Sequence, residues 1–320
     1  MTLHVRPVET TDLERVGALV ARHGRDVYDD DMLTELPLLW HKLLQARRLD
    51  MHLFIDDALP GAQCIRGVAS GAFVCDAFAD ALLAGGAPML ARQVMRAELS
   101  GRSVILTRTQ AAAANSGAGV NAVELDFAFM CDDWSVAAAR RWTPAFLESL
   151  RLWLDGWRLR MALRECIGRD LYLRVRAMGC LLQDHAAGGG QPLAPARQLY
   201  LTGMTREQSR RLPLAVASML FFDEREPRFR FSMAEQDLLL LALRNHADDE
   251  CAARLNVSPH TVKMRWRSIF EQVAKQRPNW FPAAHSPDGQ RGVEKRRHLL
   301  AYLARHMEEL RPRSRRLPVR

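Results

Sequence analysis

One stretch near the C-terminus fixes the start of a helix more firmly than any other part of the chain. Ser258 is a residue type that caps helices, and Pro259 follows at the first helical position, where its missing N–H costs nothing. Counted at about 3.6 residues per turn, the apolar side chains fall on one side of this helix. They are Val262, Trp266, Ile269, Phe270 and Val273. That side is expected to be core, and the opposite side to face outward.

The outward side of this helix is cationic. Lys263 and Arg267 lie one turn apart, with His260 and Met264 beside them. Cations at this spacing fit the phosphates along a DNA major groove and the acceptor-rich base edges on its floor. Glu271 lies one turn further on and would be repelled by phosphate, so the DNA-reading part should end before it. The alternative is an ordinary amphipathic helix with a solvated polar side.

Two shorter helices are predicted just before this one. Ser232 and Glu235 have the spacing of a capping box, and an apolar stripe follows them. Asp248 can cap the second helix, and Asn256–Ser258 makes the tight turn into the third. Two short helices followed by a cationic one are typical of a helix-turn-helix.

The segment Phe231–Val273 resembles the LuxR-type helix-turn-helix of bacterial transcription regulators. The resemblance is carried by Glu235, Leu238, Leu239, Ala252, Leu255, Val257, Ser258, Thr261, Val262, Lys263 and Ile269. It implies DNA contacts at the helix start and along its outward side. The candidate DNA-binding residues are Ser258, His260, Thr261, Lys263, Met264, Arg265 and Arg267. Two positions depart from the family pattern: Arg265 stands where His is usual, and Asn245–Ala247 replaces a glycine-containing loop.

Basic charge is concentrated toward the C-terminal end of the chain. Residues 228–320 hold 19 Arg or Lys against 10 Asp or Glu, whereas residues 1–227 hold 26 against 27. This asymmetry indicates a polyanionic partner for one part of the chain, and the helix pattern favours double-stranded DNA over membrane or RNA. With 320 residues and 48% apolar composition, the chain is long enough for two cored domains.

The sequence shows no targeting or membrane-spanning segment. Its first residues lack an apolar targeting core, and no run of about 18 apolar residues occurs. We therefore expect a cytoplasmic location and no membrane partner. The six cysteines include no Cys-x-x-Cys pair, which favours buried reduced thiols over disulfides or metal ligands.

Residues 1–133 are predicted to form an α/β domain. Alternating and Gly-rich apolar runs indicate strands, and apolar residues at helical spacing indicate helices between them. The expected strands are His4–Arg6, Met51–Ile55, Gly67–Cys75, Val104–Leu106 and Val123–Phe129, and the expected helices include Leu33–Leu44 and Pro88–Leu99. A second capping box, Thr11–Glu14, begins the first helix.

The opening of this domain is similar to the GNAT superfamily of N-acetyltransferases, in the strand Val5–Pro7 and the helix start Asp12–Leu13. That family holds the acetyl-CoA pyrophosphate with an Arg/Gln-x-x-Gly-x-Gly/Ala loop at a helix N-terminus. Arg66–Gly71 has the wrong spacing for this loop, and Gly85–Pro88 lacks the preceding basic residue. We therefore predict no cofactor. An active enzyme, a degenerate fold reused for sensing or dimerisation, and another α/β sensor fold stay open.

Residues 134–227 are predicted to be a helical connecting or dimerisation region. Thr143 can cap a helix with Pro144 at its first position, and an apolar stripe follows. The stripe consists of Phe146, Leu150, Trp153, Trp157 and Met161. It fits either the core of the first domain or the seam of a homodimer.

No catalytic constellation and no metal-ligand spacing stand out in the sequence. The predicted fold is an α/β sensory-type domain (1–133), the connecting region (134–227) and an all-α helix-turn-helix DNA-binding domain (228–320). The predicted function is a sequence-specific DNA-binding transcription regulator that is not an enzyme, with double-stranded DNA, a second copy and an unknown small-molecule effector as partners. The alternative is an acetyltransferase fused to a DNA-binding module.

Overall fold

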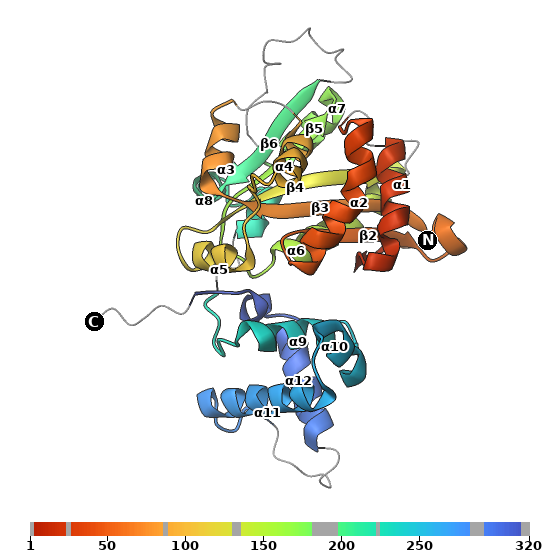
Figure 1. Cartoon of the computed structure of the whole chain (residues 1–320). Helices are drawn as coiled ribbons and strands as arrows, with labels where there is room; N and C mark the ends of the chain where they lie inside the picture. Colours follow the sequence, from red (N-terminus) through yellow and green to blue (C-terminus); the bar gives the residue numbers. More distant parts are fainter. Residues whose placement is uncertain are drawn as a thin grey trace. The chain divides into compact units, whose positions relative to one another are not determined.

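The computed structural model of the protein describes residues 3–23, 27–85, 89–129, 136–180, 198–221, 225–281 and 291–314. The chain divides into two compact units, Met1–Phe222 and Asp223–Arg320. The first unit is a sheet with helices on both faces, and the described part of the second is helical (Figure 1). No helix in the described ranges is long and apolar enough to cross a membrane.

The first unit is built on a six-stranded sheet whose strands follow chain order across it. The strands are β1 (Leu3–Pro7), β2 (Asp50–Asp56), β3 (Ile65–Val74), β4 (Val120–Phe129), β5 (Leu159–Ile167) and β6 (Leu199–Thr205). Every neighbouring pair is antiparallel except β4 and β5, which run parallel. A parallel pair needs a crossover connection, which α6 (Val136–Leu154) supplies here. The first unit thus has a mixed α/β fold.

Helices cover both faces of this sheet. On one face lie α1 (Leu13–His23), α2 (Asp30–Gln45) and α4 (Leu90–Leu99), and on the other lies α6. Because successive side chains of a strand point to opposite faces, Leu53 joins the core under α1 and α2 while Phe54 packs against Trp142 of α6. The other helices of this unit are α3 (Asp76–Leu83), α5 (Arg108–Ser116), α7 (Arg169–Ala177) and α8 (Arg206–Arg211).

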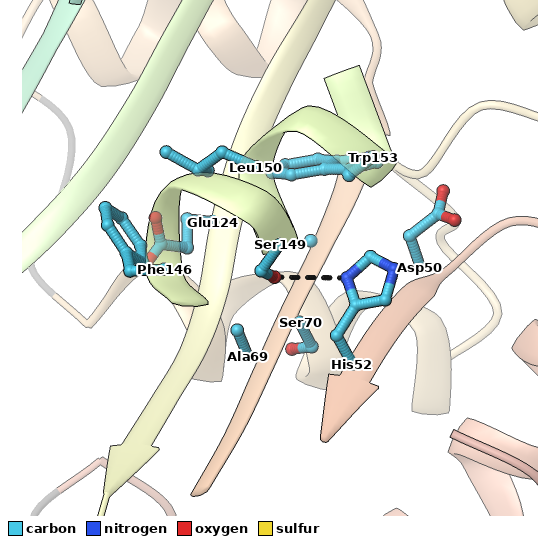
Figure 2. Close-up of a pocket in the computed structure, with 10 residues that line it drawn as sticks. Asp50, His52, Ala69, Ser70, Glu124, Phe146, Ser149, Leu150 and Trp153 are labelled. Carbon is cyan, nitrogen blue, oxygen red and sulfur yellow. Dashed lines mark hydrogen bonds between the residues drawn. The ribbon is translucent and has the colours of Figure 1, made fainter. Parts of the chain in front are cut away.

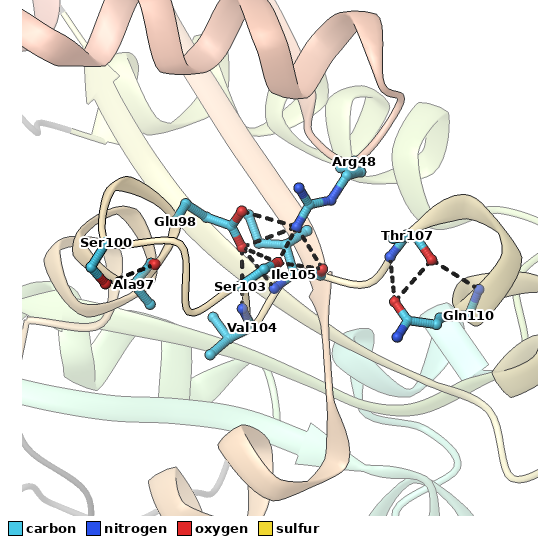
Figure 3. A network of polar contacts seen from close by, with 9 residues as sticks. All are labelled: Arg48, Ala97, Glu98, Ser100, Ser103, Val104, Ile105, Thr107 and Gln110. Atoms are coloured by element: carbon cyan, nitrogen blue, oxygen red, sulfur yellow. Dashed lines mark hydrogen bonds and ion pairs between the residues drawn. The ribbon is translucent and has the colours of Figure 1, made fainter.

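A polar network fastens the segment between β3 and β4, which carries α3, α4 and α5, to the end of α2 (Figure 3). Arg48 and Glu98 form an ion pair with a 2.9 Å N···O distance, and the Glu98 side chain is almost fully buried. The Glu98 carboxylate also accepts hydrogen bonds from Ser103 Oγ at 2.6 Å and from the N–H groups of Val104 and Ile105, both at 3.1 Å. A buried ion pair is stable only when its remaining polar atoms are satisfied, as they are at this carboxylate.

The described residues of the second unit form four α-helices and a 3-10 turn. They are α9 (Met233–Leu243), α10 (Asp248–Leu255), α11 (Pro259–Gln276), α12 (Arg291–Leu303) and the turn Met307–Leu310. The core lies between them, around Leu238, Val262, Ile269 and Leu299. The helix predicted from Pro259 begins there, with Ser258 Oγ accepting a hydrogen bond from the Thr261 N–H at 3.1 Å.

The connecting region, residues 134–227, supplies α6, β5 and β6 to the first unit. The helix predicted to begin after Thr143 begins at Val136 instead, so Pro144 lies inside it. Trp142 is buried against β1 and β2, and this packing favours a helix that extends back past the proline.

The apolar stripe of this helix is core. Trp153 is 5% exposed and stacks on Phe73 with a centroid distance of 5.8 Å. The helix ends at Leu154, so Trp157 and Met161 do not extend the stripe along it. The seam of a homodimer, which was the alternative, is therefore not formed by Trp153.

Candidate functional site

The parallel strands β4 and β5 part halfway along the sheet. They pair from Val120 opposite Leu159 to Glu124 opposite Arg164. Beyond this pair, β4 continues along β3 to Phe129, and β5 continues along β6 to Ile167. We call this place the fork, meaning the Glu124 and Arg164 pair with the strand ends Leu125–Phe129 and Glu165–Ile167. In the described strands, the two inner edges of the fork do not pair with each other.

A β-bulge lies at the fork. Gly71 of β3 is opposite Glu124, whereas the preceding residue, Ser70, is opposite Asp126, so Leu125 is one residue extra. Residues directly opposite one another share a face of the sheet, and Ser70 and Gly71 point to opposite faces. The bulge therefore sends the carboxylates of Glu124 and Asp126 to opposite faces. Bulges are over-represented beside active sites because they re-aim side chains in this way.

Glu124 is a buried carboxylate at the point where the strands part. Its Oε1 lies 3.3 Å from Arg164 Nη2 but makes no hydrogen bond within the described part of the chain. Burial raises the pKa of Glu124, the Arg164 guanidinium opposes this rise, and the charge of Asp126 adds to it. A carboxyl group with a raised pKa and a spare acceptor atom is suited to take up a proton from a bound group.

A small cavity lies beside Glu124, between the sheet and α6 (Figure 2). Its lining residues are Asp50, His52, Ala69, Ser70, Gly71, Glu124, Phe146, Ser149, Leu150 and Trp153. Within it, Ser149 Oγ of α6 and His52 Nδ1 of β2 lie 3.1 Å apart in a hydrogen bond. The volume is about 10 Å³, which is room for about one water molecule.

Asp126 forms a second buried polar group on the opposite face. Tyr28 Oη donates to Asp126 Oδ1 at 2.6 Å, and Ser70 Oγ donates to Oδ2 at 2.7 Å. Burial raises the pKa of Asp126, although both hydrogen bonds lower it. These contacts tie the residues before α2 to the bulge of β4.

The N-terminus of α4 already binds a carboxylate. Glu165 of β5 accepts hydrogen bonds from the N–H groups of Met89 and Leu90, both at 2.9 Å. Of the two phosphate loops considered from the sequence, Arg66–Gly71 lies within β3, and Gly85–Pro88 falls partly outside the described residues. The described part of the chain also contains no group of three or more His, Cys, Asp or Glu side chains that could hold a metal ion.

The candidate DNA-binding residues gather at the start and along the outward side of α11. Lys263, Met264 and Arg267 are exposed, as are Ser258 and His260, whereas Thr261 and Arg265 are partly covered. Ser258 and Thr261 are engaged in capping the helix. Arg267 Nε donates to Glu271 Oε1 at 2.8 Å, so the anion expected to end the DNA-reading part also binds one of its cations.

Sequence reasoning missed the residues of the fork. Glu124 and Asp126 interrupt the apolar run of β4, and Arg164 is one of three charged residues in β5. Charged residues in strands that are largely covered were the available signal. No short motif contains Glu124 and Arg164 together, because they are 40 positions apart in the sequence.

No family model matches the sequence, and no curated protein matches it. Solved structures similar to the chain include Arabidopsis thaliana NAA60 in complex with acetyl-CoA, at 14% identity over 64% of this chain and 98% of that chain, with a TM-score of 0.37. Mutant forms of the spermidine/spermine N-acetyltransferase SpeG of Vibrio cholerae are 10% identical over 66% of this chain and 97% of that chain, with a TM-score of 0.37. FeeM, an N-acyl amino acid synthase from uncultured soil microbes, is 12% identical over 65% of this chain and 94% of that chain, with a TM-score of 0.37.

These neighbours contradict the main functional prediction. They are N-acetyltransferases and an N-acyl amino acid synthase, so the prediction of a DNA-binding transcription regulator that is not an enzyme is wrong, and the alternative, an acetyltransferase, is favoured. The prediction relied on the short motifs of the helical unit, and no short motif marks the strand arrangement of the fork. At these identities the likeness concerns the fold, so the chemistry must be argued from the fork itself.

Proposed function

We propose that the first unit is an N-acyltransferase that moves an acyl group from a thioester donor to an amine. The observation that carries the proposal is the fork, where two parallel strands part beside the buried carboxylate of Glu124. The backbone edge beyond Glu124 no longer pairs with β5 in the described strands, so its N–H groups can face a donor carbonyl. A carboxyl group of raised pKa stands at the place where that edge begins.

The chain's own residues supply the proton transfer. An amine attacks only when it is unprotonated, and ionised Glu124 can accept the proton that the amine loses. As the N–C bond forms and the C–S bond breaks, negative charge develops on the carbonyl oxygen, where the backbone N–H groups of the fork can stabilise it. The thiolate leaves, and the proton that Glu124 took from the amine passes to it through solvent, which returns Glu124 to its ionised form. The Arg164 guanidinium favours the ionised form of Glu124, because it opposes the rise in pKa that burial causes.

The proposal names no residues that would bind phosphate groups of the donor. The segment 130–135 between β4 and α6 lies outside the described residues, and its sequence, Met130 to Ser135, holds two aspartates and no glycine. Such a sequence lacks the phosphate loop that the GNAT resemblance implies. The proposal therefore concerns a thioester donor and leaves the group that carries the thiol open.

The test is thiol release by the purified full-length chain. Acetyl-CoA and a longer acyl-CoA are the donors, and the acceptors are a set of primary amines that includes a polyamine, an amino acid and a peptide N-terminus. Acylated amine should appear at the same rate as free thiol. The absence of thiol release above the uncatalysed rate with every pair would overturn the proposal.

We further propose that the second unit binds duplex DNA through the outward side of α11. This proposal is supported by the exposed side chains of Lys263, Met264 and Arg267 on a helix whose start is fixed by Ser258. The affinity of the full-length chain for a random-sequence duplex should fall linearly with salt on a double logarithmic scale, and a flat response would exclude it. A homodimer and a small-molecule effector remain predictions, and sedimentation of the full-length chain tests the first of them.

A further inference from the structure

Trp266 anchors α11 from its inner side. Its side chain is buried and stacks near Phe270, with ring centroids 5.5 Å apart. The indole Nε1–H donates a hydrogen bond of 3.2 Å to Asp248 Oδ1 at the start of α10. Trp266 is adjacent in sequence to Arg267, which lies on the outward side. The position of the outward side chains therefore depends on where the indole ring is held.

Arg296 of α12 contacts both Asp248 and Trp266. Its Nη1 donates to the same Asp248 oxygen at 2.7 Å, and its guanidinium carbon lies 4.5 Å from the centre of the Trp266 ring. One arginine thus contacts α10 through an ion pair and α11 through a cation–π contact. Both contacts are partly covered from solvent, where such interactions are stronger than at a fully exposed surface.

The neighbours of Arg296 show that this orientation is specific. Arg296 is the middle residue of the basic cluster Lys295–Arg297, in which Arg297 is exposed and the other two side chains are partly covered. Lys295 Nζ lies 5.5 Å from the centre of the Phe281 ring, and Arg296 points at Trp266. Arg297 is exposed on the same helix and makes no contact of these kinds among the described residues.

We infer that Arg296 is a positioning residue for DNA binding, which fixes the outward side of α11 by holding Trp266 and Asp248 together. The inference rests on the proposed binding of duplex DNA by α11 and adds the role of the fourth helix to it. A planar guanidinium can stack on an indole and bind a carboxylate at once, whereas an ammonium group makes a point contact. Arg296→Lys should therefore keep the positive charge but hold Trp266 and Asp248 together less well.

The experiment compares Arg296→Gln and Arg296→Lys with Arg297→Gln in the full-length chain. The DNA probe is a random-sequence duplex pool, and affinity is measured by fluorescence anisotropy at several salt concentrations. Arg296→Gln should weaken DNA binding about tenfold, whereas the slope of log affinity against log salt should stay that of the unmodified chain. The affinity of Arg296→Lys should lie between those of Arg296→Gln and the unmodified chain. The Trp266 indole N–H signal in the NMR spectrum should move in Arg296→Gln and stay in place in Arg297→Gln.

Three outcomes would overturn the inference. If the salt slope of Arg296→Gln drops by about 1, Arg296 contacts phosphate directly and does not act through Trp266. If affinity and the indole signal are both unchanged while the unmodified chain binds DNA, the contact has no positioning role. If the unmodified chain does not bind DNA at all, the proposed role of α11 fails first, and this result is distinct from the other two.

Discussion

The Glu124 carboxylate lies 3.3 Å from the Arg164 guanidinium at the last residue pair that joins β4 to β5. Beyond this pair the two strands part. The ion pair therefore lies where the parallel pairing of β4 and β5 ends and where the proposed catalytic site begins. Burial raises the pKa of Glu124, and Arg164 opposes that rise. The pair therefore holds a carboxyl group whose pKa is raised by burial and moderated by its partner.

Glu124→Gln should lower kcat/KM for thiol release by about 10²- to 10⁴-fold, because glutamine cannot accept a proton from the amine.

In the unmodified chain, kcat/KM should fall as the pH drops through the raised pKa of Glu124, since a protonated base is inactive. Arg164→Gln should move this acidic limb to higher pH, because the guanidinium lowers the pKa of Glu124.

Glu148→Gln is the matched control for Glu124→Gln. Glu148 lies on α6 and is partly exposed, where it pairs with Arg151. Its removal should leave kcat/KM and the pH profile unchanged. Full activity in Glu124→Gln would exclude Glu124 as the base.

Asp126→Asn should change how stability depends on pH. Burial raises the pKa of Asp126, so its protonated form favours the folded state below the pKa of the unfolded chain. That stabilisation is lost as the pH rises through the folded-state pKa. Because asparagine stays neutral, the free energy of unfolding of the variant minus that of the unmodified chain should increase as the pH rises from about 4, the ordinary pKa of an aspartate, through the raised folded-state pKa.

The measurement for Asp126→Asn is urea unfolding at several pH values. Glu35→Gln, on the exposed side of α2, should keep the pH profile of the unmodified chain. A difference between Asp126→Asn and the unmodified chain that stays constant with pH would show that Asp126 does not titrate differently in the folded state.

Gly71→Ala should destabilise the first unit by about 1–3 kcal/mol, because the added methyl group would overlap the indole ring of Trp153. Thermal unfolding measures the loss. Gly117→Ala is the control, since a methyl group there would be 3.5 Å from its nearest neighbour, the carbonyl oxygen of Ala113. Adding Trp153→Leu to Gly71→Ala should cost less than the sum of the two single changes, and strict additivity would show that the two sites do not touch.

Glu271→Gln should strengthen DNA binding about threefold, because it releases Arg267 from its ion pair and removes an anion from the proposed DNA side of α11. Lys263→Ala should weaken binding and, if Lys263 contacts a phosphate, reduce the salt slope by about 1. Fluorescence anisotropy titrations at several salt concentrations measure both changes. Weaker binding by Glu271→Gln would place the DNA on another side of the helix.

Local sequence chemistry determined the starts of α9 and α11. Asp248, predicted to cap α10, is instead the first residue of that helix, and Ala247 is at the cap position. Ser258 and Pro259 begin α11, and Ser232 with Glu235 forms the capping box of α9. These features were predictable because a cap and the N–H group it binds lie within three residues of each other. The predicted strand over Gly67–Cys75 is confirmed for Gly67–Val74, which lies in β3, whereas Cys75 caps α3. An apolar run of this kind carries its own local signal.

Tertiary structure alone decided the candidate site. Glu124 meets Arg164 only because a crossover helix brings β5 parallel to β4, and the bulge at Leu125 then separates Glu124 from Asp126. Pairing register and the end of pairing depend on strands far apart in the sequence, so no local pattern contains them. Packing likewise overrode the cap signal at Pro144, since the burial of Trp142 extended α6 past it. The sequence thus determined where several elements begin, and long-range pairing and burial decided which side chains meet.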